Sequence, residues 1–346
     1  MRVLMVGPDL SVHGGISGVV NNYYKAGLDK KIELCYIGTM VEGSKIRKMI
    51  QAVTAYFRFL GKITKYEIVH VNMASDTSYW RKSFFIKTAK AFHKKVVIHQ
   101  HGGDFEGFYY RQLGDRGRKK VKKVLSMGDA FLVLAPFFQD FFGGIIDKNK
   151  ITVLPDAIQI SPPASKEYGQ HRLLFLGRIC KAKGIEELLW SMPFLKEKFP
   201  DVKLYLGGIF EDQELQKKVE ELSGLVEWIG WVTGKEKENY LKKCDIFVLP
   251  SYFEGQSVSI LEAMSYSCAV VASRIGGIPQ MIEDGVTGIL VEPKNAESLR
   301  QGLEKALADS TLCERLGKAA RKKAAEEFSM EKNMEQLLAI YEAVWR

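Results

Sequence analysis

Short, almost continuously apolar runs alternate with longer helical patterns along this chain, and that alternation restricts the fold more than any other feature. In the first half the runs lie at 2–6, 67–71, 95–99, 130–134 and 151–155. Such runs are typical of strands covered on both faces, and strands that alternate with helices form parallel, doubly wound sheets. We expect helices in the gaps, notably over 78–92 and 116–127.

The stretch 156–171 interrupts this rhythm with two prolines, a glycine and polar residues, which is typical of a linker. The alternation restarts at 172–177 and continues at 202–208, 226–231, 245–251, 269–273 and 288–293. The sequence therefore predicts an α/β protein with two successive doubly wound, Rossmann-like sheets and an inter-domain crevice. We expect domains over 1–160 and 161–328, with a final amphipathic helix, 329–346, that packs back on the first domain.

Charge is distributed unevenly between the two halves. Residues 1–165 carry 25 Lys and Arg against 13 Asp and Glu, a net +12, whereas residues 166–346 carry 25 against 28, a net −3. A basic half predicts an anionic partner, and a solvated basic surface is the alternative. The five cysteines are scattered without a C-x-x-C pair, which argues against zinc and disulfides and for a reducing, cytoplasmic location.

The segment "PSYFEGQSVSILEAM" (250–264) places Glu254 in a loop and Glu262 in the helix that follows it. The first amides of a helix lack intrahelical acceptors and form a seat for an anion. A carboxylate on either side of that seat can accept hydrogen bonds from two neighbouring hydroxyl groups, because it offers two acceptor oxygens. This arrangement fits a nucleoside diphosphate sugar, and two surface glutamates are the alternative.

Cations follow the first strand of the second half. In "LGRICKAKGIEELL" (176–189), Arg178 and Lys183 stand between the strand and the next helix. An Arg fork and a Lys point charge can hold a diphosphate and stabilise it as a leaving group. An ordinary basic loop is the alternative.

Glycines and histidines follow two strands of the first half. Gly14 and Gly15 allow close approach of backbone to a ligand, although the run is not G-x-G-x-x-G and a plain turn fits too. His101 is expected at an open strand end near the crevice, and His99 in the packing, because strand neighbours alternate. The two histidines and Asp104 could suggest a metal site. A third ligand at a suitable spacing is missing, however, so we expect no metal.

Several blocks of this sequence resemble the retaining glycosyltransferases of family four, which have the GT-B fold. The matching blocks are "HGGISGVV", "HQHG", "LGRICKAKGIEEL", "CDIFVLPSYFEGQSVSILEAM" and "GGIPQMIEDGVTGILVEP". The resemblance spans most of the chain. It implies an N-terminal acceptor-binding domain and a C-terminal domain that binds the nucleotide sugar.

The resemblance implies a role for each matching residue. Gly14 and Gly15 contact the donor's phosphates, and Arg178 and Lys183 hold the diphosphate. His101 lies beside the reacting sugar. No metal and no cofactor are implied, since the nucleotide sugar is a co-substrate.

The glutamate segment is implied to bind the rest of the donor. Glu254 contacts the transferred sugar, the amides of Gly255, Gln256 and Ser257 support sugar and phosphate, and Glu262 holds the ribose. Gln256 and Ser257 depart from the family's usual residues, which puts the identity of the donor sugar in doubt. Ser267, Ala269 and Gln280 depart too, with an expected effect on packing only.

The stretch 75–86 looks like members of the family that build bacterial surface polysaccharides. Ser78, Tyr79, Trp80 and Arg81 then line the acceptor side, and a helix start with a buried Trp80 is the alternative. The segment 45–65 is basic and amphipathic with no acidic residue, and 116–124 adds six cations. This pattern predicts contact with an anionic membrane, and a core-packed helix is the alternative.

The sequence therefore predicts a retaining, metal-independent hexosyltransferase, peripheral on the inner face of the cell membrane. The donor is a nucleotide diphosphate sugar, with UDP favoured over GDP, and the acceptor a saccharide or polyprenyl-linked saccharide. No nucleic acid is expected as a partner. A sugar-nucleotide 2-epimerase of similar fold and a catalytically silent saccharide- or lipid-binding subunit remain as rivals.

Overall fold

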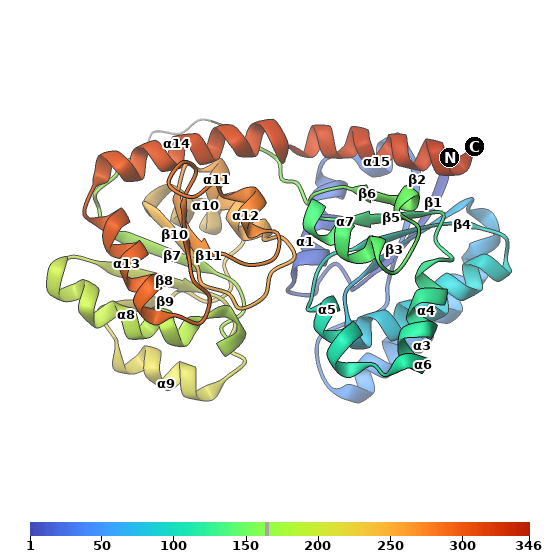
Figure 1. Cartoon of the computed structure of the whole chain (residues 1–346), viewed down its shortest axis with the longest axis horizontal. Coiled ribbons are helices and arrows are strands. Elements are labelled where there is room, and N and C mark those ends of the chain that lie inside the picture. The colour runs from blue at the N-terminus through green and yellow to red at the C-terminus, as the bar shows by residue number, and fades with distance from the viewer. Residues whose placement is uncertain (163–165) are drawn as a thin grey trace. The chain divides into compact units, whose positions relative to one another are not determined.

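The computed structural model describes residues 1–162 and 166–346, and it divides into two compact units, each built on one six-stranded sheet (Figure 1). Unit 1 is Met1–Gln159 together with Met330–Arg346, and unit 2 is Ile160–Ser329. Every strand pair in both sheets is parallel. The predicted α/β class with two doubly wound sheets is therefore confirmed.

The sheet of unit 1 has the order β2-β1-β3-β4-β5-β6. Its strands are β1 (Arg2–Gly7), β2 (Glu33–Gly38), β3 (Ile68–Met73), β4 (Lys95–Gln100), β5 (Ala130–Val133) and β6 (Ile151–Val153). The order reverses between β1 and β3, and ligands of such sheets bind beyond the carboxyl ends of the strands at that point. Val6, Val71 and Ile98 from these strands belong to one buried core with Phe59 and Phe85 of the covering helices.

Helices cover both faces of this sheet (Figure 1). They are α1 (Gly15–Lys25), α2 (Leu28–Lys31), α3 (Lys45–Lys62), α4 (Asp76–Ala91), α5 (Phe105–Gly107), α6 (Asp115–Leu125), α7 (Pro136–Gly143) and α15 (Met330–Trp345). Short helical turns occupy Ile63–Lys65, Phe108–Gln112 and Lys148–Lys150. The last helix, α15, packs on α1 and β4, and its Asn333 Nδ2 donates to the Pro155 carbonyl at 2.5 Å.

The sheet of unit 2 has the order β12-β11-β10-β7-β8-β9. Its strands are β7 (Arg172–Leu176), β8 (Lys203–Gly207), β9 (Val226–Trp228), β10 (Ile246–Leu249), β11 (Ala269–Ser273) and β12 (Ile289–Val291). Counted within the unit, this is the Rossmann order 3-2-1-4-5-6, with its switch point between β7 and β10.

The helices of unit 2 also lie on both faces of the sheet (Figure 1). They are α8 (Ile185–Lys198), α9 (Gln213–Glu221), α10 (Gly234–Lys243), α11 (Val258–Ser265), α12 (Ile278–Met281), α13 (Ala296–Leu307) and α14 (Ser310–Glu327), with a short turn at Lys181–Lys183. Side chains cap the N-termini of several of these helices. Asn295 accepts from the Ser298 amide at 2.9 Å, and Asp309 accepts from the Leu312 amide at 2.9 Å.

One strand differs from the sequence-based prediction. The strand β2 was not expected, because "ELCYIG" begins with an exposed glutamate and is only partly buried along most of its length. Such a pattern is typical of an edge strand, which β2 is. The predicted linker 156–171 includes residues 163–165, which lie outside the described residues, and no helix or strand is assigned to its described part. No helix in the described ranges has the length and apolar character needed to cross a bilayer.

Candidate functional site

Two loops meet at the switch point of the unit 2 sheet, beyond the ends of β7 and β10. The Tyr252 amide in the loop after β10 donates to the Ala182 carbonyl in the loop after β7, at 2.9 Å. Gly184 has a φ of +69°, and a Cβ built on it would lie 2.0 Å from the Pro250 carbonyl oxygen. The close approach of the two loops therefore requires glycine at 184.

Lys183 and Glu254 are brought together where these loops meet. The ammonium of Lys183 forms an ion pair with Glu254 Oε1, and Ser251 Oγ donates to the same oxygen at 2.8 Å. The two side chains are 20% and 11% exposed. The pair is therefore desolvated enough to be electrostatically strong, yet it remains reachable by a ligand.

A third loop closes on the backbone of Glu254. Gly276 has a φ of +50°, and a Cβ there would lie 1.9 Å from the Glu254 carbonyl oxygen. The Gly277 amide donates to the same carbonyl at 3.4 Å. The "GG" of residues 276–277 is thus the feature that lets this turn pack against the glutamate, holding its backbone in place.

The helix α11 starts directly after the glutamate loop. Ser257 caps it by accepting from the Ile260 amide at 3.4 Å, and the amides of the first turn have no intrahelical acceptor. Glu262 lies in the second turn and accepts from Lys237 Nζ of α10 at 2.5 Å. The two glutamates therefore pair with different lysines, which gives each carboxylate a separate charge partner.

Arg178 lies apart from the Lys183–Glu254 pair. Its guanidinium donates to Glu211 Oε1 at 2.9 Å, and both side chains are about half exposed. An exposed ion pair of this kind contributes about 0–1 kcal/mol, so Arg178 can exchange Glu211 for another anion at little cost.

The glycine loop of unit 1 is open. Gly14 and Gly15 stand at the start of α1, both exposed, and a Cβ on either would meet no atom within 4 Å. Gly14 has an extended backbone, which any residue can adopt. The phosphate contact expected of these glycines stays a prediction.

His99 and His101 lie together. His99 is fully buried, as expected, but the exposed position expected for His101 and the alternation that was to separate the two side chains are wrong. The side chain of His101 is only 2% exposed rather than at an open strand end, because Asn72 and Asp156 occupy the space at its two ring nitrogens. His99 shares its side of the sheet, since residues two apart along a strand point the same way. The ring centroids of His99 and His101 are 3.8 Å apart.

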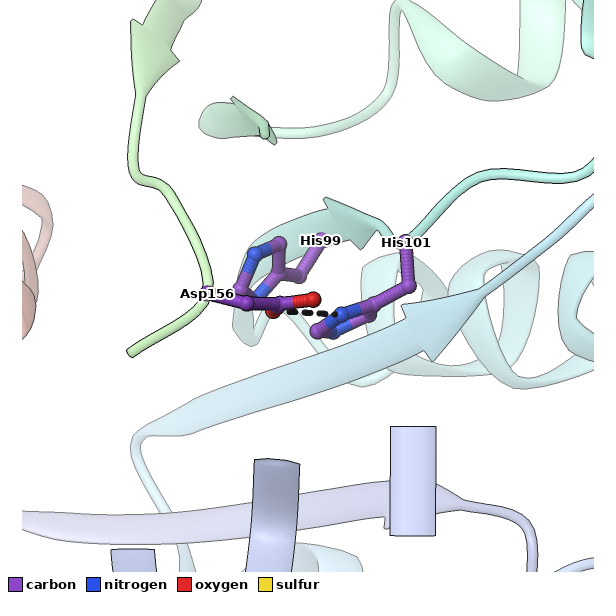
Figure 2. Close-up of side chains that lie close together, drawn as sticks. All are labelled: His99, His101 and Asp156. Carbon is purple, nitrogen blue, oxygen red and sulfur yellow. Dashed lines mark ion pairs between the residues drawn. The ribbon is translucent and has the colours of Figure 1, made fainter. Parts of the chain in front are cut away.

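Asp156 supplies the third member of this cluster, which the sequence-based search did not find (Figure 2). It belongs to the predicted linker, and its Oδ1 lies 3.2 Å from His101 Nδ1. Asp104, the acidic residue considered from sequence, instead pairs with Arg111 and caps a helical turn through the Gly107 amide. A third potential ligand, Asp156, is therefore present, contrary to the expectation from sequence.

The neighbouring histidines are held neutral by burial. Burial lowers the pKa of His70 to about 3 and that of His99 well below its usual range, and proximity to His101 acts in the same direction for both. The Nδ1 of His70 lies 2.6 Å from the Tyr341 hydroxyl of α15. These rings therefore enter any chemistry as neutral imidazoles.

The predicted acceptor residues divide between surface and core. Tyr79 is fully buried, whereas Trp80 is 40% exposed, so the alternative of a buried Trp80 is wrong. Ser78 Oγ accepts from the Ala74 amide at 3.1 Å, and Arg81 is partly buried. Only Trp80 of this group presents a large side chain to solvent.

Two residues that the sequence did not single out contact the glutamates. Ser251 is the last residue of the run "DIFVLPS", and its position at a strand end was a usable signal. Lys237 lies in a separate helix with nothing in its local pattern to distinguish it.

Comparison with known proteins agrees with this architecture. Residues 158–323 match the family described as glycosyl transferases group 1. An uncharacterized glycosyltransferase of Methanocaldococcus jannaschii is 31% identical over 172 residues, covering 49% of this chain and 44% of that protein. The chain spans about half the length of the first curated relatives that it matches.

Solved structures share the fold over nearly the whole chain. Sucrose-phosphate synthase from Thermosynechococcus elongatus superposes with a TM-score of 0.83 at 19% identity, covering 99% of both chains. HepE of Anabaena, solved in complex with UDP and glucose, superposes with a TM-score of 0.79 at 15% identity, covering 99% of this chain and 100% of HepE.

Proposed function

We propose that this chain, whose residues 158–323 match the glycosyl transferases group 1 family, is a retaining, metal-independent glycosyltransferase. It moves a hexosyl unit from a nucleotide diphosphate sugar to a hydroxyl of a saccharide or a lipid-linked saccharide. The observation that carries this proposal is the Lys183–Glu254 pair at the switch point of the unit 2 sheet. Anionic ligands of doubly wound sheets bind at this position.

Donor binding is proposed to exchange the partners of the charged groups. The ion pairs Lys183–Glu254 and Arg178–Glu211 break, and both cations bind the diphosphate instead. Glu254 is then free to accept hydrogen bonds from hydroxyls of the transferred sugar. A lysine held in place before the reaction stabilises the growing charge of the leaving diphosphate without reorganisation.

The helix α11 is proposed to hold the nucleotide side of the donor. The amides of Gly255, Gln256 and Ser257 face the sugar and phosphate at the helix start. Glu262 accepts from the ribose hydroxyls while it keeps Lys237, since a carboxylate has two acceptor oxygens.

Transfer is proposed to proceed on one face of the sugar, as the family resemblance implies. The bond between the anomeric carbon and the phosphate oxygen breaks, and the acceptor oxygen bonds the same face. The acceptor's proton passes to the departing phosphate oxygen, so no enzymic nucleophile is needed. His101 enters this scheme only through the resemblance, because its side chain is nearly buried and bonds Asn72.

A UDP-sugar is the favoured donor, supported by the likeness to HepE, which was solved with UDP and glucose. The test is a panel of UDP- and GDP-sugars, in which release of free nucleotide is followed with and without saccharide acceptors. The proposal expects one donor to turn over, with release accelerated by acceptor. Binding of saccharide without turnover of any donor would favour the silent-subunit alternative.

The acceptor is proposed to be presented at an anionic membrane, on the inner face, as in surface-polysaccharide synthesis. The support is a row of large apolar side chains along the outward face of α3, each 50–67% exposed: Ile46, Met49, Ile50, Val53 and Phe57. They recur every three or four residues and so share one side of the helix. Ala55 and Phe59 are buried on the other side, so α3 has two apolar faces.

Positive charge surrounds this row. Arg47, Lys48 and Arg58 are exposed on α3, which packs on α4, and α4 packs on the basic helix α6 (Figure 1). Apolar insertion combined with cations at the lipid headgroups is the combination by which interfacial helices bind anionic bilayers. Each cation close to such a surface contributes about 1 kcal/mol. The alternative of a core-packed helix does not account for the outward row.

Liposome co-sedimentation tests the membrane part. Binding to vesicles with anionic lipid should weaken as salt rises and fall at least tenfold when Arg47, Lys48, Arg58 and Lys62 are changed to Gln. Changing Lys217, Lys235, Lys318 and Lys322 of unit 2 to Gln removes the same charge elsewhere and should have little effect. If the unaltered chain ignores anionic vesicles at low salt, a soluble acceptor replaces the lipid-linked one.

A further inference from the structure

Arg81 of α4 is a partly buried cation that lacks a counter-ion in the part of the chain that the structure describes. Its Nε is buried and has no hydrogen-bond partner among the described residues. Burial lowers the pKa of its guanidinium, and no carboxylate of those residues acts in the opposite direction. Taking a charge out of water is costly unless a partner replaces the lost hydration, so Arg81 has an electrostatic need that an anionic ligand can meet.

Two other partly buried arginines illustrate how the fold usually satisfies a guanidinium. Arg300 forms ion pairs with two glutamates of its own helix, α13, and these contacts raise its pKa. Arg321 donates to two backbone carbonyl groups. Arg81 differs from both, because none of its contacts with the described residues supplies a charged or hydrogen-bonding partner. A purely structural role therefore does not account for its charge.

The neighbour of Arg81 places it at the ligand-binding edge of the unit 1 sheet. Burial lowers the pKa of Lys82, and the charge of Arg81 acts in the same direction. Lys82 Nζ contacts the Thr39 hydroxyl, which donates at 2.8 Å to the carbonyl of Gly7, the last residue of β1. The switch point of this sheet lies between β1 and β3, and ligands of doubly wound sheets bind beyond the carboxyl ends of the strands there.

Arg81 also lies on the side of α4 that faces α3 (Figure 1). It precedes Phe85 by one turn, and residues four apart share a helix face. The Phe85 ring packs edge-on against Tyr56 of α3, with 5.5 Å between the ring centroids. Because α3 carries the exposed apolar row of the proposed membrane surface, an anion bound to Arg81 would lie next to the helix that meets the bilayer.

We propose that Arg81 binds a phosphate group in the linkage between the saccharide and the lipid of the acceptor. A guanidinium presents its N–H donors in a planar fork that matches the oxygens of a phosphate. A sugar carboxylate would also fit the fork, but it would not require a position beside α3. This inference rests on the proposed function and deepens it, because it selects a phosphate-bearing, lipid-linked saccharide over a free saccharide.

Titration calorimetry of the full chain with farnesyl diphosphate, a short and soluble lipid phosphate, tests binding apart from transfer. Arg81→Gln should weaken binding at least tenfold, and Arg81→Lys, which keeps the charge without the fork, should weaken it less. Arg116→Gln removes an exposed charge of the same unit and should change nothing. Lys183→Ala should also leave the affinity unchanged, because that lysine belongs to the proposed donor site of unit 2.

Thermal unfolding separates ligand binding from a structural role. Arg81→Gln removes a partly buried charge that has no partner, so its Tm should equal or exceed that of the unaltered chain. A lower Tm would show that Arg81 supports the fold and would overturn the inference. Binding to anionic vesicles should be the same for both chains. Weaker vesicle binding by Arg81→Gln would identify a phospholipid headgroup as the ligand instead.

Kinetics connect the site with transfer. Arg81→Gln should raise the KM for a phosphate-bearing acceptor at least tenfold and leave the KM for the donor unchanged, and a saccharide without phosphate should serve both chains equally. Equal affinity of both chains for farnesyl diphosphate would overturn the inference, as would a loss confined to Lys183→Ala, which would place the lipid phosphate in the donor site. Binding through Arg81 without turnover of any donor would leave this site intact and refute the proposed transfer instead.

Discussion

The two units differ in how they place their titratable side chains. In unit 2, Lys183 and Glu254 are charged, paired and partly exposed, and Glu262 pairs with Lys237 in the same manner. In unit 1, His99 and Lys82 are fully buried, and burial lowers the pKa of each well below its usual range. Paired, reachable charges can exchange partners with an anionic ligand, whereas buried neutral groups cannot.

This difference favours unit 2 as the place where the proposed anionic donor binds. Bringing a diphosphate next to Lys183 replaces one carboxylate partner with another anion, so the lysine never loses its counter-charge. Protonating Lys82 would create a fully buried charge whose polar contact is the Thr39 hydroxyl, itself donating to the Gly7 carbonyl. The basic surface of unit 1 lies instead on its exposed helices.

The largest expected effect comes from breaking the charge pair of unit 2. Lys183→Ala should lower kcat/KM by about 100-fold or more, because it removes a contact to the departing diphosphate. Lys181→Ala, in the same turn and paired with the partly exposed Glu186 and the exposed Glu214, should leave kcat/KM nearly unchanged. Steady-state kinetics measure kcat/KM for both variants. Near-normal turnover by the Lys183 variant would end its assignment.

A smaller effect separates the two glutamates of unit 2. Glu262→Gln should weaken UDP binding by about tenfold to 100-fold, since it removes a charged acceptor for the ribose, worth about 1.5–3 kcal/mol. Glu254→Gln should leave UDP affinity nearly intact while depressing transfer, because its partner is the sugar. Titration calorimetry with UDP measures both. The reverse pattern would exchange the two roles.

The smallest effect concerns the buried lysine of unit 1. Because folding lowers the pKa of Lys82, the unfolded chain binds a proton that the folded chain does not, and stability rises as pH approaches the ordinary lysine pKa of about 10.4. Lys82→Met should therefore raise stability at pH 7 by about 1 kcal/mol and flatten the rise between pH 7 and 10.

Urea unfolding at the two pH values measures this, with Lys87→Met as the matched control on the exposed side of the same helix. Destabilisation by Lys82→Met at pH 7 would mean that the amine is charged and supported in the fold. The contrast between the units would then be weaker than we describe.

Local pattern was sufficient for most of the fold and for part of the site. The strands of unit 2 were visible because "DIFVLPS" and its counterparts are apolar on both faces, and the loops after them contain Lys183 and Glu254. Edge strand β2 was missed because its apolar signal is weak. Strand-end position is therefore readable from sequence, whereas partial burial at a sheet edge is not.

Contacts between segments distant in the chain could not be predicted. Asp156 reaches His101 across 55 positions, and its setting in a Pro-rich stretch indicated only a linker. Arg178 forms an ion pair with Glu211, and Glu262 forms one with Lys237. Neither Glu211 nor Lys237 lies in a segment with a distinguishing motif. Chemistry that depends on such pairings is decided by tertiary structure, which a motif does not contain.

NMR of the product made from anomerically ¹³C-labelled donor tests whether the Lys183–Glu254 site of unit 2 carries out retaining transfer. We expect a glycosylated acceptor whose labelled carbon keeps the anomeric configuration of the donor, and loss of that product in the Lys183→Ala chain. Inverted configuration would contradict the retaining mechanism. Donor returned as its 2-epimer, without a glycosylated acceptor, would contradict transfer itself.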